Sequence, residues 1–318
     1  MSISPFETDL KLLPSEHNPA TRDAEIAVSD HAIRMWCSAV GEDDPVHVDI
    51  EAARGAGYDD VVAPEAMLQT WTMPIGDAAK LAAPTLHSRV RQIAHSHNLS
   101  AVVATDYEQQ YLRPIHPGDV LKERSWIEYV SPAKQTSLGT GHFVSIAFEI
   151  RNQNDDTIGT LRARTFYFDP TNARPHAANT GSERPSGTDS VELPTKEIVL
   201  TRTLIISASL ASNDHEPVHH DHILAREQGL TDIIASIVTT AGLVNRYVGV
   251  WAGTGRQLKK LSLRLAQPAY PDDTLTFTGR TEPHEAHTLV LVEGRHSRGV
   301  HVFATVELEG HPGSQSHV

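Results

Sequence analysis

The stretch GEDDPVHVD (residues 41–49) returns as NDHEPVHHD (residues 213–221), without a gap and 172 residues further along the chain. Pro, Val, His and the final Asp occupy the same places in both copies. The agreement continues at the same offset, where the shared residues are Ala53 and Ala225, Arg54 and Arg226, Gly57 and Gly229, Asp60 and Asp232, and Ala63 and Ala235. Self-similarity of this kind is typical of an internal repeat, so the chain consists of two copies of one supersecondary unit.

The division into units follows from length and local composition. A chain of 318 residues is long enough for two domains, because one core usually serves about 100 to 200 residues. Residues 171–194 are rich in Pro, Ser, Thr, Gly and Asn and have no periodicity, which is typical of a linker. We therefore predict an N-terminal unit at residues 1–170, this linker, and a C-terminal unit at residues 195–318.

Charge and cysteine content exclude several classes of protein. A net charge of −13 argues against sequence-independent nucleic-acid binding, which needs a basic face. Cys37 is the only cysteine, so no intrachain disulfide is expected and a reducing compartment fits best. Residues 1–15 lack the basic and apolar regions of a signal peptide, and no apolar run approaches membrane-spanning length. We expect a cytoplasmic protein that binds neither nucleic acid nor membrane.

Hydrophobic periodicity predicts an α+β unit in each copy. Apolar residues alternate with polar ones at residues 144–150 and 161–167 of the first copy and at residues 261–265 and 300–308 of the second. A period of two indicates strands with one buried face. Residues 235–251 are nearly all apolar and contain no Pro, which favours a buried helix. An antiparallel sheet wrapped around one buried helix is the expected arrangement in each copy.

The two copies differ around this central helix. In the first copy the helix expected from Pro64 onwards is interrupted by Pro74 and Gly76. The spacing from the motif histidine to the next shared motif (residues 114–121 and 268–275) is 67 residues in the first copy and 49 in the second, an excess of 18. We predict a shortened helix followed by extra chain, with space for a bulky ligand beside it.

The repeated loop of the second copy carries the candidate chemistry. Asp214 and His219 are five residues apart, and Pro217 between them enforces a rigid, non-helical turn. Such a turn can direct a carboxylate and an imidazole at one small volume, where the pair can hold and deprotonate a water molecule. A structural role fits equally well, with Asp214 as a helix cap and His219 as a core residue. From the loop alone both interpretations stay open.

A family resemblance favours the chemical interpretation. The loop, the buried helix and the pattern Asp-x3-Ala-Arg-x2-Gly-x2-Asp (residues 221–232) resemble the MaoC-like hydratases and dehydratases, whose motif is Gly-Asp-x-Asn-Pro-(Leu/Ile/Val)-His. The resemblance implies a double hot-dog fold of the α+β class, with two hot-dog units. It also places the catalytic Asp and His of the family on Asp214 and His219. Asn213 and Glu216 depart from the motif, which has Gly and Asn there.

The first copy resembles the dehydratase-type partner unit of the same superfamily, with AVGEDDPVH at residues 39–47. Glu42 stands where the motif has Asp, and its longer side chain displaces the carboxylate by about 1 Å, enough to disturb a water site. We therefore expect Glu42 and His47 to form a degenerate counterpart site, with the first unit supplying the wall of the substrate pocket. The alternative that this copy is also active stays open.

The resemblance implies (R)-specific hydration of trans-2-enoyl-CoA thioesters, or the reverse dehydration of 3-hydroxyacyl thioesters. The backbone at Ser236 and Ile237 is then expected to stabilise the thioester oxygen, with Glu216 helping to position the substrate. Rival functions are a catalytically silent acyl-CoA-binding subunit and a 3-hydroxyacyl-carrier-protein dehydratase of fatty acid or polyketide synthesis. A thioesterase is disfavoured by the Pro-Val-His motif.

Within the family, the pairing of units most resembles the actinobacterial steroid side-chain enoyl-CoA hydratases, where related units occur on separate subunits. Residues 217–221, 242–247 and 251–253 carry this likeness. A bulky or steroid acyl group is therefore one candidate substrate. A short or medium acyl chain fits the motifs equally well.

Coenzyme A is polyanionic, so an acidic protein must gather cations to hold it. Arg256, Lys259, Lys260 and Arg264 lie close together in the sequence and form the candidate cluster, and Arg89 and Arg91 in the extra chain of the first copy are further candidates. Each is also explained as the guard of a strand edge. We expect no metal and no redox cofactor, because His284, His287, His296 and His301 lack a metal-ligand spacing such as His-x3-His on a helix. Coenzyme A enters as part of the substrate. The two units are expected to form an intrachain pseudo-dimer, and a further homodimer stays open.

Overall fold

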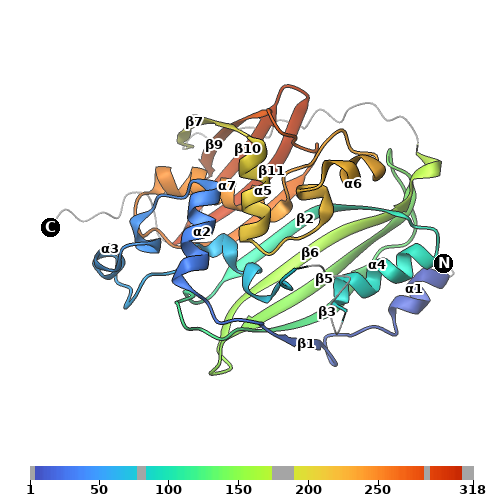
Figure 1. Ribbon diagram of the computed structural model, residues 1–318, viewed down its shortest axis with the longest axis horizontal. Coiled ribbons are helices and arrows are strands. Elements are labelled where there is room, and N and C mark those ends of the chain that lie inside the picture. Colours follow the sequence, from blue (N-terminus) through green and yellow to red (C-terminus); the bar gives the residue numbers. More distant parts are fainter. Residues whose placement is uncertain (1–3, 77–83, 174–189, 283–286, 310–318) are drawn as a thin grey trace.

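The computed structural model describes residues 4–76, 84–173, 190–282 and 287–309, and its strands form one antiparallel sheet (Figure 1). Eleven strands take part, in the order β1-β3-β5-β6-β2-β8-β11-β10-β9-β7, with β4 pairing β5. Their bounds are β1 Ala20–Asp23, β2 Ala101–Tyr111, β3 Lys122–Val130, β4 Lys134–Gln135, β5 Thr140–Arg151, β6 Thr157–Asp169, β7 Glu192–Val199, β8 Leu258–Leu265, β9 Thr274–Glu282, β10 His287–His296 and β11 Gly299–Glu309.

The two units meet edge to edge in this sheet. Strand β2 of the first unit pairs with β8 of the second in an antiparallel register that runs from Asp106 opposite Arg264 to Gln110 opposite Lys260. The backbone hydrogen bonds therefore continue across the boundary, and each unit covers the strand edge that the other would otherwise expose. This arrangement confirms the predicted α+β double hot-dog fold.

The central helices lie on one face of the sheet (Figure 1). Helices α2, α5 and α7 contact one another there. The bounds of the helices are α1 Pro5–Leu10, α2 Asp30–Val40, α3 Ile50–Gly55, α4 Leu86–Ser96, α5 Arg202–Ala211, α6 His222–Glu227 and α7 Ile237–Ala252, and those of the 3-10 turns are η1 Pro45–His47, η2 Glu65–Met67, η3 Thr70–Thr72, η5 Pro170–Asn172 and η6 Pro217–His219. Within the described residues, no helix combines the length and apolar character needed to cross a bilayer.

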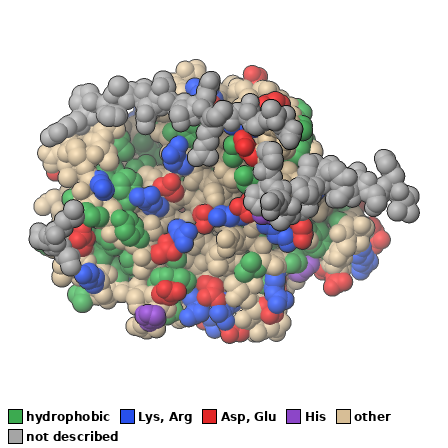
Figure 2. Space-filling view, turned by 180° about the vertical axis from the view of Figure 1, so that it is seen from behind, with side chains coloured by type: hydrophobic (Ala, Val, Ile, Leu, Met, Phe, Trp, Pro, Cys, Tyr) green, Lys and Arg blue, Asp and Glu red, His purple; other side chains and the backbone are tan. Residues whose placement is uncertain are grey.

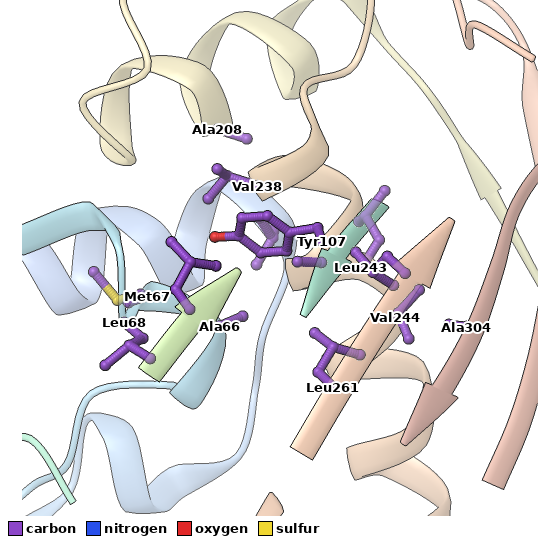
Figure 3. Packing of buried hydrophobic residues seen from close by; sticks show 14 of the residues in the cluster. Ala66, Met67, Leu68, Tyr107, Ala208, Val238, Leu243, Val244, Leu261 and Ala304 are labelled. Carbon is purple, nitrogen blue, oxygen red and sulfur yellow. The ribbon is translucent and has the colours of Figure 1, made fainter. Parts of the chain in front are cut away.

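The larger of two clusters of buried hydrophobic residues in the described part of the chain joins the two units. Figure 3 shows Met67 and Tyr107 of the first unit close to Val238 and Leu243 of the second, and all four belong to one cluster of buried residues. Helix α7 is the centre of this core, because ten of its sixteen residues are buried. The continuous apolar run that predicted a buried helix at residues 235–251 is thereby explained.

The first unit has no such helix in its described residues, and its counterpart is the two short 3-10 turns η2 and η3. The shortened helix predicted from Pro74 and Gly76 is confirmed. The extra chain of this copy folds into α4, whose buried residues Leu86, Val90 and Ala94 face the interior. Helix α4 packs against β6 and α1. The space predicted for a bulky ligand stays a prediction.

The linker predicted at residues 171–194 falls largely outside the described residues, since 174–189 are not among them. Its last residues are already part of the sheet. Strand β7 begins at Glu192 and pairs with β9, with Glu192 opposite Arg280. The first strand of the second unit therefore begins before residue 195, where the boundary was predicted. This strand was not foreseen, because its mixed polarity shows no clear apolar alternation.

Candidate active site

The loop that carries Asp214 is fixed by its own backbone. The N–H of Asp214 donates to the carbonyl of Ser209 at 3.0 Å, and the Ser209 hydroxyl donates to the carbonyl of Asp214. Asn213, which replaces the Gly of the motif, adopts a left-handed conformation with φ +56°. Asn is one of the few non-glycine residues that tolerates this region, so the departure from the motif preserves the turn.

Asp214 and His219 face each other across a short gap. His219 Nε2 lies 3.6 Å from Asp214 Oδ2, and each side chain is about one-tenth exposed (11% and 10%). The other ring nitrogen, Nδ1, lies 2.8 Å from the carbonyl oxygen of Ile234. A carbonyl only accepts, so Nδ1 carries a proton, and Nε2 is the ring nitrogen that faces Asp214. The distance is too long for a direct hydrogen bond and too short to hold a water molecule between the two atoms, so a water that contacts both must lie beside them.

The N-terminus of α7 supplies donors next to this pair, because Ile234, which anchors His219, lies only two residues before the helix cap. Ser236 Oγ caps the helix by accepting from the Thr239 N–H at 3.0 Å. Ile237 and Val238 occupy the first turn, where backbone N–H groups have no intrahelical carbonyl. The position favours a developing negative charge. The structure thus brings the predicted Ser236 and Ile237 to the same region as His219.

The cap of α7 is supported from below by a buried histidine. His301 on β11 lies 2.9 Å from Thr240 Oγ1 through Nε2, and 2.7 Å from the carbonyl of Gln267 through Nδ1. Thr240 in turn lies 2.9 Å from the carbonyl of Ser236. Burial lowers the pKa of His301 to about 4, so its imidazole is neutral. The simple alternation of β11 placed His301 on the polar face, but the structure buries it with 1% exposure because the β10–β11 register shifts at a bulge.

The first unit contributes a wall of polar residues to the site. The Asn213 side-chain amide donates to the Thr70 carbonyl at 3.3 Å. Tyr107 donates its hydroxyl hydrogen to Gln69 Oε1 at 2.8 Å, and burial together with the charge of Asp214 raises the pKa of this phenol. Burial lowers the pKa of the His87 imidazole on α4, and the negative charges of Glu216 and Asp214 oppose that decrease.

Glu216, which replaces the Asn of the motif, also contacts the first unit. Both of its carboxylate oxygens lie within hydrogen-bond distance of Arg91 Nη1 on α4, at 3.0 and 2.9 Å. Sequence reasoning placed Glu216 near the substrate but did not foresee this pairing or the presence of His87. The sequence feature that pointed to them was the excess of 18 residues in the first copy, part of which forms α4, the helix that carries His87 and Arg91.

The equivalent loop of the first copy has a different arrangement of charges. His47 Nδ1 lies 2.8 Å from the carbonyl oxygen of Val62, as His219 does from Ile234. Glu42, however, turns back on its own loop, where Oε1 accepts from the N–H groups of Asp43 and Asp44, both at 3.1 Å. Its carboxylate is therefore engaged by the backbone, which fits the expectation of a degenerate counterpart site.

Chain from the second unit covers this first-copy site. Asp44 Oδ2 accepts from the Gly255 N–H at 3.0 Å, and Glu65 Oε1 accepts from the Leu258 N–H at 3.2 Å. Burial raises the pKa of Glu65, and the nearby His47 opposes that rise. Gly255 has φ +73°, and a Cβ there would meet Ala56 at 2.8 Å, so the fit is close. At the second-copy position equivalent to Asp44, Glu216 contacts Arg91 on α4 instead.

The coenzyme A cations predicted in the second copy are not brought to Asp214. On β8, Leu263 pairs with Tyr107 on the side of the helices, so Lys260 and Arg264 alternate onto the opposite face. Figure 2 shows the molecule from behind, with basic and acidic side chains interleaved. The partners of the four cations are the Glu309 carbonyl at 2.8 Å for Arg256, Glu309 at 3.2 Å for Lys259, Glu108 at 2.9 Å for Lys260, and the Phe303 ring at 5.2 Å for Arg264.

Comparison with known proteins agrees with the two-unit architecture. Residues 19–161 match the family model of the FAS1-like dehydratase domain region, and residues 188–296 match that of the MaoC-like domain. The chain is 44% identical over 117 residues to the beta subunit of 3-oxo-4,17-pregnadiene-20-carboxyl-CoA hydratase from Mycobacterium tuberculosis, covering 36% of this chain and 91% of the relative. The chain belongs to the MaoC-like hydratases and dehydratases, which are hydro-lyases.

Two further relatives of this MaoC-like chain are alpha subunits. It is 35% identical over 174 residues to a probable enoyl-CoA hydratase alpha subunit from Thermomonospora curvata, covering 54% of each chain. It is 32% identical over 152 residues to the alpha subunit of the Mycobacterium tuberculosis hydratase, covering 47% of each chain. The chain therefore spans about half the length of these two relatives.

Solved structures share the fold over nearly the whole chain. A MaoC-like dehydratase superposes with a TM-score of 0.72 at 18% identity, covering 92% of this chain and 98% of the other. A MaoC-like dehydratase from Phytophthora capsici superposes with a TM-score of 0.65 at 14% identity, covering 95% and 98%. At these identities the likeness establishes the double hot-dog fold alone.

Proposed function

We propose that the protein catalyses the (R)-specific hydration of trans-2-enoyl-CoA thioesters, and the reverse dehydration, at Asp214 and His219 of its second unit. The observation that carries this proposal is the 3.6 Å distance between the carboxylate and Nε2, placed beside the N-terminus of α7. A water molecule beside the pair that donates to both acceptors is oriented and made more nucleophilic, which is what addition to an activated alkene requires.

In the proposed reaction, a water molecule forms hydrogen bonds to Asp214 and to His219 Nε2, and its oxygen, which keeps one hydrogen, forms a bond to the β-carbon of the enoyl group. The π electrons of the double bond move onto the thioester oxygen as an enolate. The N–H groups of Ile237 and Val238 stabilise that charge. The Asp214–His219 pair takes one proton from the water and returns one proton to the α-carbon as the enolate collapses. The net change is the addition of one H2O across the double bond.

The relatives support the choice of a coenzyme A thioester. Alpha and beta subunits of one Mycobacterium tuberculosis hydratase both match this chain, over 152 and 117 residues. We infer that the two units of this chain are fused counterparts of such subunits, with the first unit as the pocket wall. A bulky acyl group, such as a steroid side chain, is the candidate substrate that this likeness favours, and the (R) configuration is proposed from the loop motif.

The test is loss of the enoyl absorbance on mixing the protein with short-chain, medium-chain and steroid side-chain enoyl-CoA substrates. Asp214→Asn keeps the shape of the side chain but removes its charge, so we expect a loss of at least about 10²-fold in kcat/KM. Glu42→Gln is the matched control in the other copy and should remain within about threefold. The product should resist an (S)-specific 3-hydroxyacyl-CoA dehydrogenase. Loss of activity in Glu42→Gln with full activity in Asp214→Asn would assign the reaction to the first copy and contradict the proposal.

A further inference from the structure

A pair of side chains outside the proposed water site links the two units at the catalytic loop. Arg91 belongs to α4 of the first unit, and Glu216 lies two residues after Asp214 in the second. We propose that Arg91 is a positioning residue for hydration: by holding the Glu216 carboxylate it fixes the loop that carries Asp214 and His219. This inference rests on the function proposed above, and it makes α4 part of the catalytic apparatus.

The backbone of Glu216 transmits its position to His219. Glu216 is the N-cap residue of η6, and its carbonyl accepts the His219 N–H at 3.0 Å. A displacement of Glu216 therefore moves the backbone of the catalytic imidazole. Because proton transfer and water addition depend on distances near 3 Å, a shift of about 1 Å is enough to cost about 10²-fold in rate.

Among the described residues, Arg91 is the hydrogen-bond partner of the Glu216 side chain. The Glu216 side chain makes no capping hydrogen bond to η6, whereas Asp44, at the same place in the first copy, caps η1 by accepting from the Val46 N–H at 3.2 Å. The Glu216 carboxylate instead reaches Arg91 with both oxygens, at 3.0 and 2.9 Å. Asp44 thus combines a local cap with a contact to the Gly255 N–H of the other unit, whereas the Glu216 carboxylate contacts the other unit without capping its own turn.

Arg91 is held on a packed support rather than on a free surface loop. Its helix α4 is capped by Thr85 and buries Leu86, Val90 and Ala94. The other end of the catalytic loop is tied to the same unit, because the Asn213 amide donates to the Thr70 carbonyl at 3.3 Å. The loop is therefore held from the first unit on both sides of Asp214.

The exposure of the Arg91–Glu216 ion pair allows a positioning role to be distinguished from a role in folding stability. Both side chains are 39% exposed, and ion pairs in such surroundings contribute little to folding stability. Removing the pair should therefore change the rate without a matching change in the melting temperature. A structural role would move both together.

The experiment measures kcat, KM and melting temperature for Arg91→Met, Glu216→Gln, the double variant and Arg91→Lys. We expect kcat to fall about 10- to 100-fold in each of the first two, KM to change less than about threefold, and the double variant to be no worse than either single one, since both remove one contact. Arg91→Lys restores a cation and should recover part of the rate. Arg113→Met, which removes the exposed pair with Asp156, is the control and should leave kcat unchanged.

Three results would overturn the proposal. A higher KM in Arg91→Met with an unchanged Glu216→Gln would make Arg91 a ligand for the phosphates of coenzyme A. A fall in kcat that tracks the melting temperature would make the pair structural. Unchanged kinetics in every variant would leave the loop independent of α4, while the proposed function stands; absence of turnover by the unmodified protein would instead remove the proposed function and this inference with it.

Discussion

His47 and His219 are held in the same way in the two copies, with Nδ1 of each ring 2.8 Å from a backbone carbonyl oxygen. The copies differ in what faces the other ring nitrogen. Asp214 lies 3.6 Å from Nε2 of His219, whereas the Glu42 carboxylate is taken up by backbone N–H groups of its own loop. Both copies therefore orient the histidine ring in the same way, and the second copy places a carboxylate oxygen 3.6 Å from the other ring nitrogen.

The proposed donors at the start of α7 can be tested with proline. Ile237 is the first residue of the helix, where proline is tolerated, and Ser236 before it has the extended ψ of 163° that proline requires. Ile237→Pro removes one N–H and keeps the helix, so we expect kcat to fall about 10²- to 10³-fold. Ile237→Val, which keeps the N–H, is the control. Equal rates in the two variants would show that this N–H is not a donor to the substrate.

The left-handed residue of the catalytic loop gives a stability prediction. Asn213 has φ +56°, which costs an Ala side chain more than it costs Gly. Asn213→Ala and Asn213→Gly both lose the bond to the Thr70 carbonyl, so their comparison isolates the backbone term. We expect the Gly variant to be more stable by about 1 kcal/mol in chemical denaturation. A more stable Ala variant would contradict the left-handed turn.

Acid should destabilise the protein through His301. Its folded pKa of about 4 lies below the ordinary value of 6.5, so the unfolded chain takes up the proton first as the pH falls. The contribution of His301 to the free energy of unfolding is therefore complete above pH 6.5 and is lost progressively as the pH falls to 4. Between pH 7 and pH 5 the wild type should lose about 2 kcal/mol more than His301→Gln in denaturant titrations. Parallel losses in both proteins would show that His301 is not responsible.

The contact between α2 and α7 depends on a glycine. A Cβ on Gly242 would meet the Trp36 ring at 2.7 Å, and Trp36 is only 1% exposed, so the ring has little room to move. We expect Gly242→Ala to lower the free energy of unfolding by about 1 to 3 kcal/mol despite the better helix propensity of Ala. Gly249→Ala in the same helix meets nothing within 4 Å and should raise stability by up to about 1 kcal/mol. Equal effects of the two substitutions would contradict the packing.

Local patterns in the sequence predicted much of the fold. The repeat, the apolar run at residues 235–251 and the alternating segments are short-range signals, and the structure confirms α7 and the strands they predicted. Edge strand β7 was missed because most of its residues are exposed and many are polar, so its composition resembles that of a linker. His301 was placed on the wrong face because a bulge breaks the period of two.

The candidate site shows where local signals end. The turn that brings Asp214 toward His219 is encoded within six residues, so the sequence by itself determined the loop, its anchoring proline and the asymmetry between the two copies. Only the tertiary structure decided that Arg91 meets Glu216 across 125 residues, and that Gly255 covers Asp44 across 211. Backbone propensity and one-face burial act over a few residues, whereas the meeting of distant segments depends on how the whole core packs.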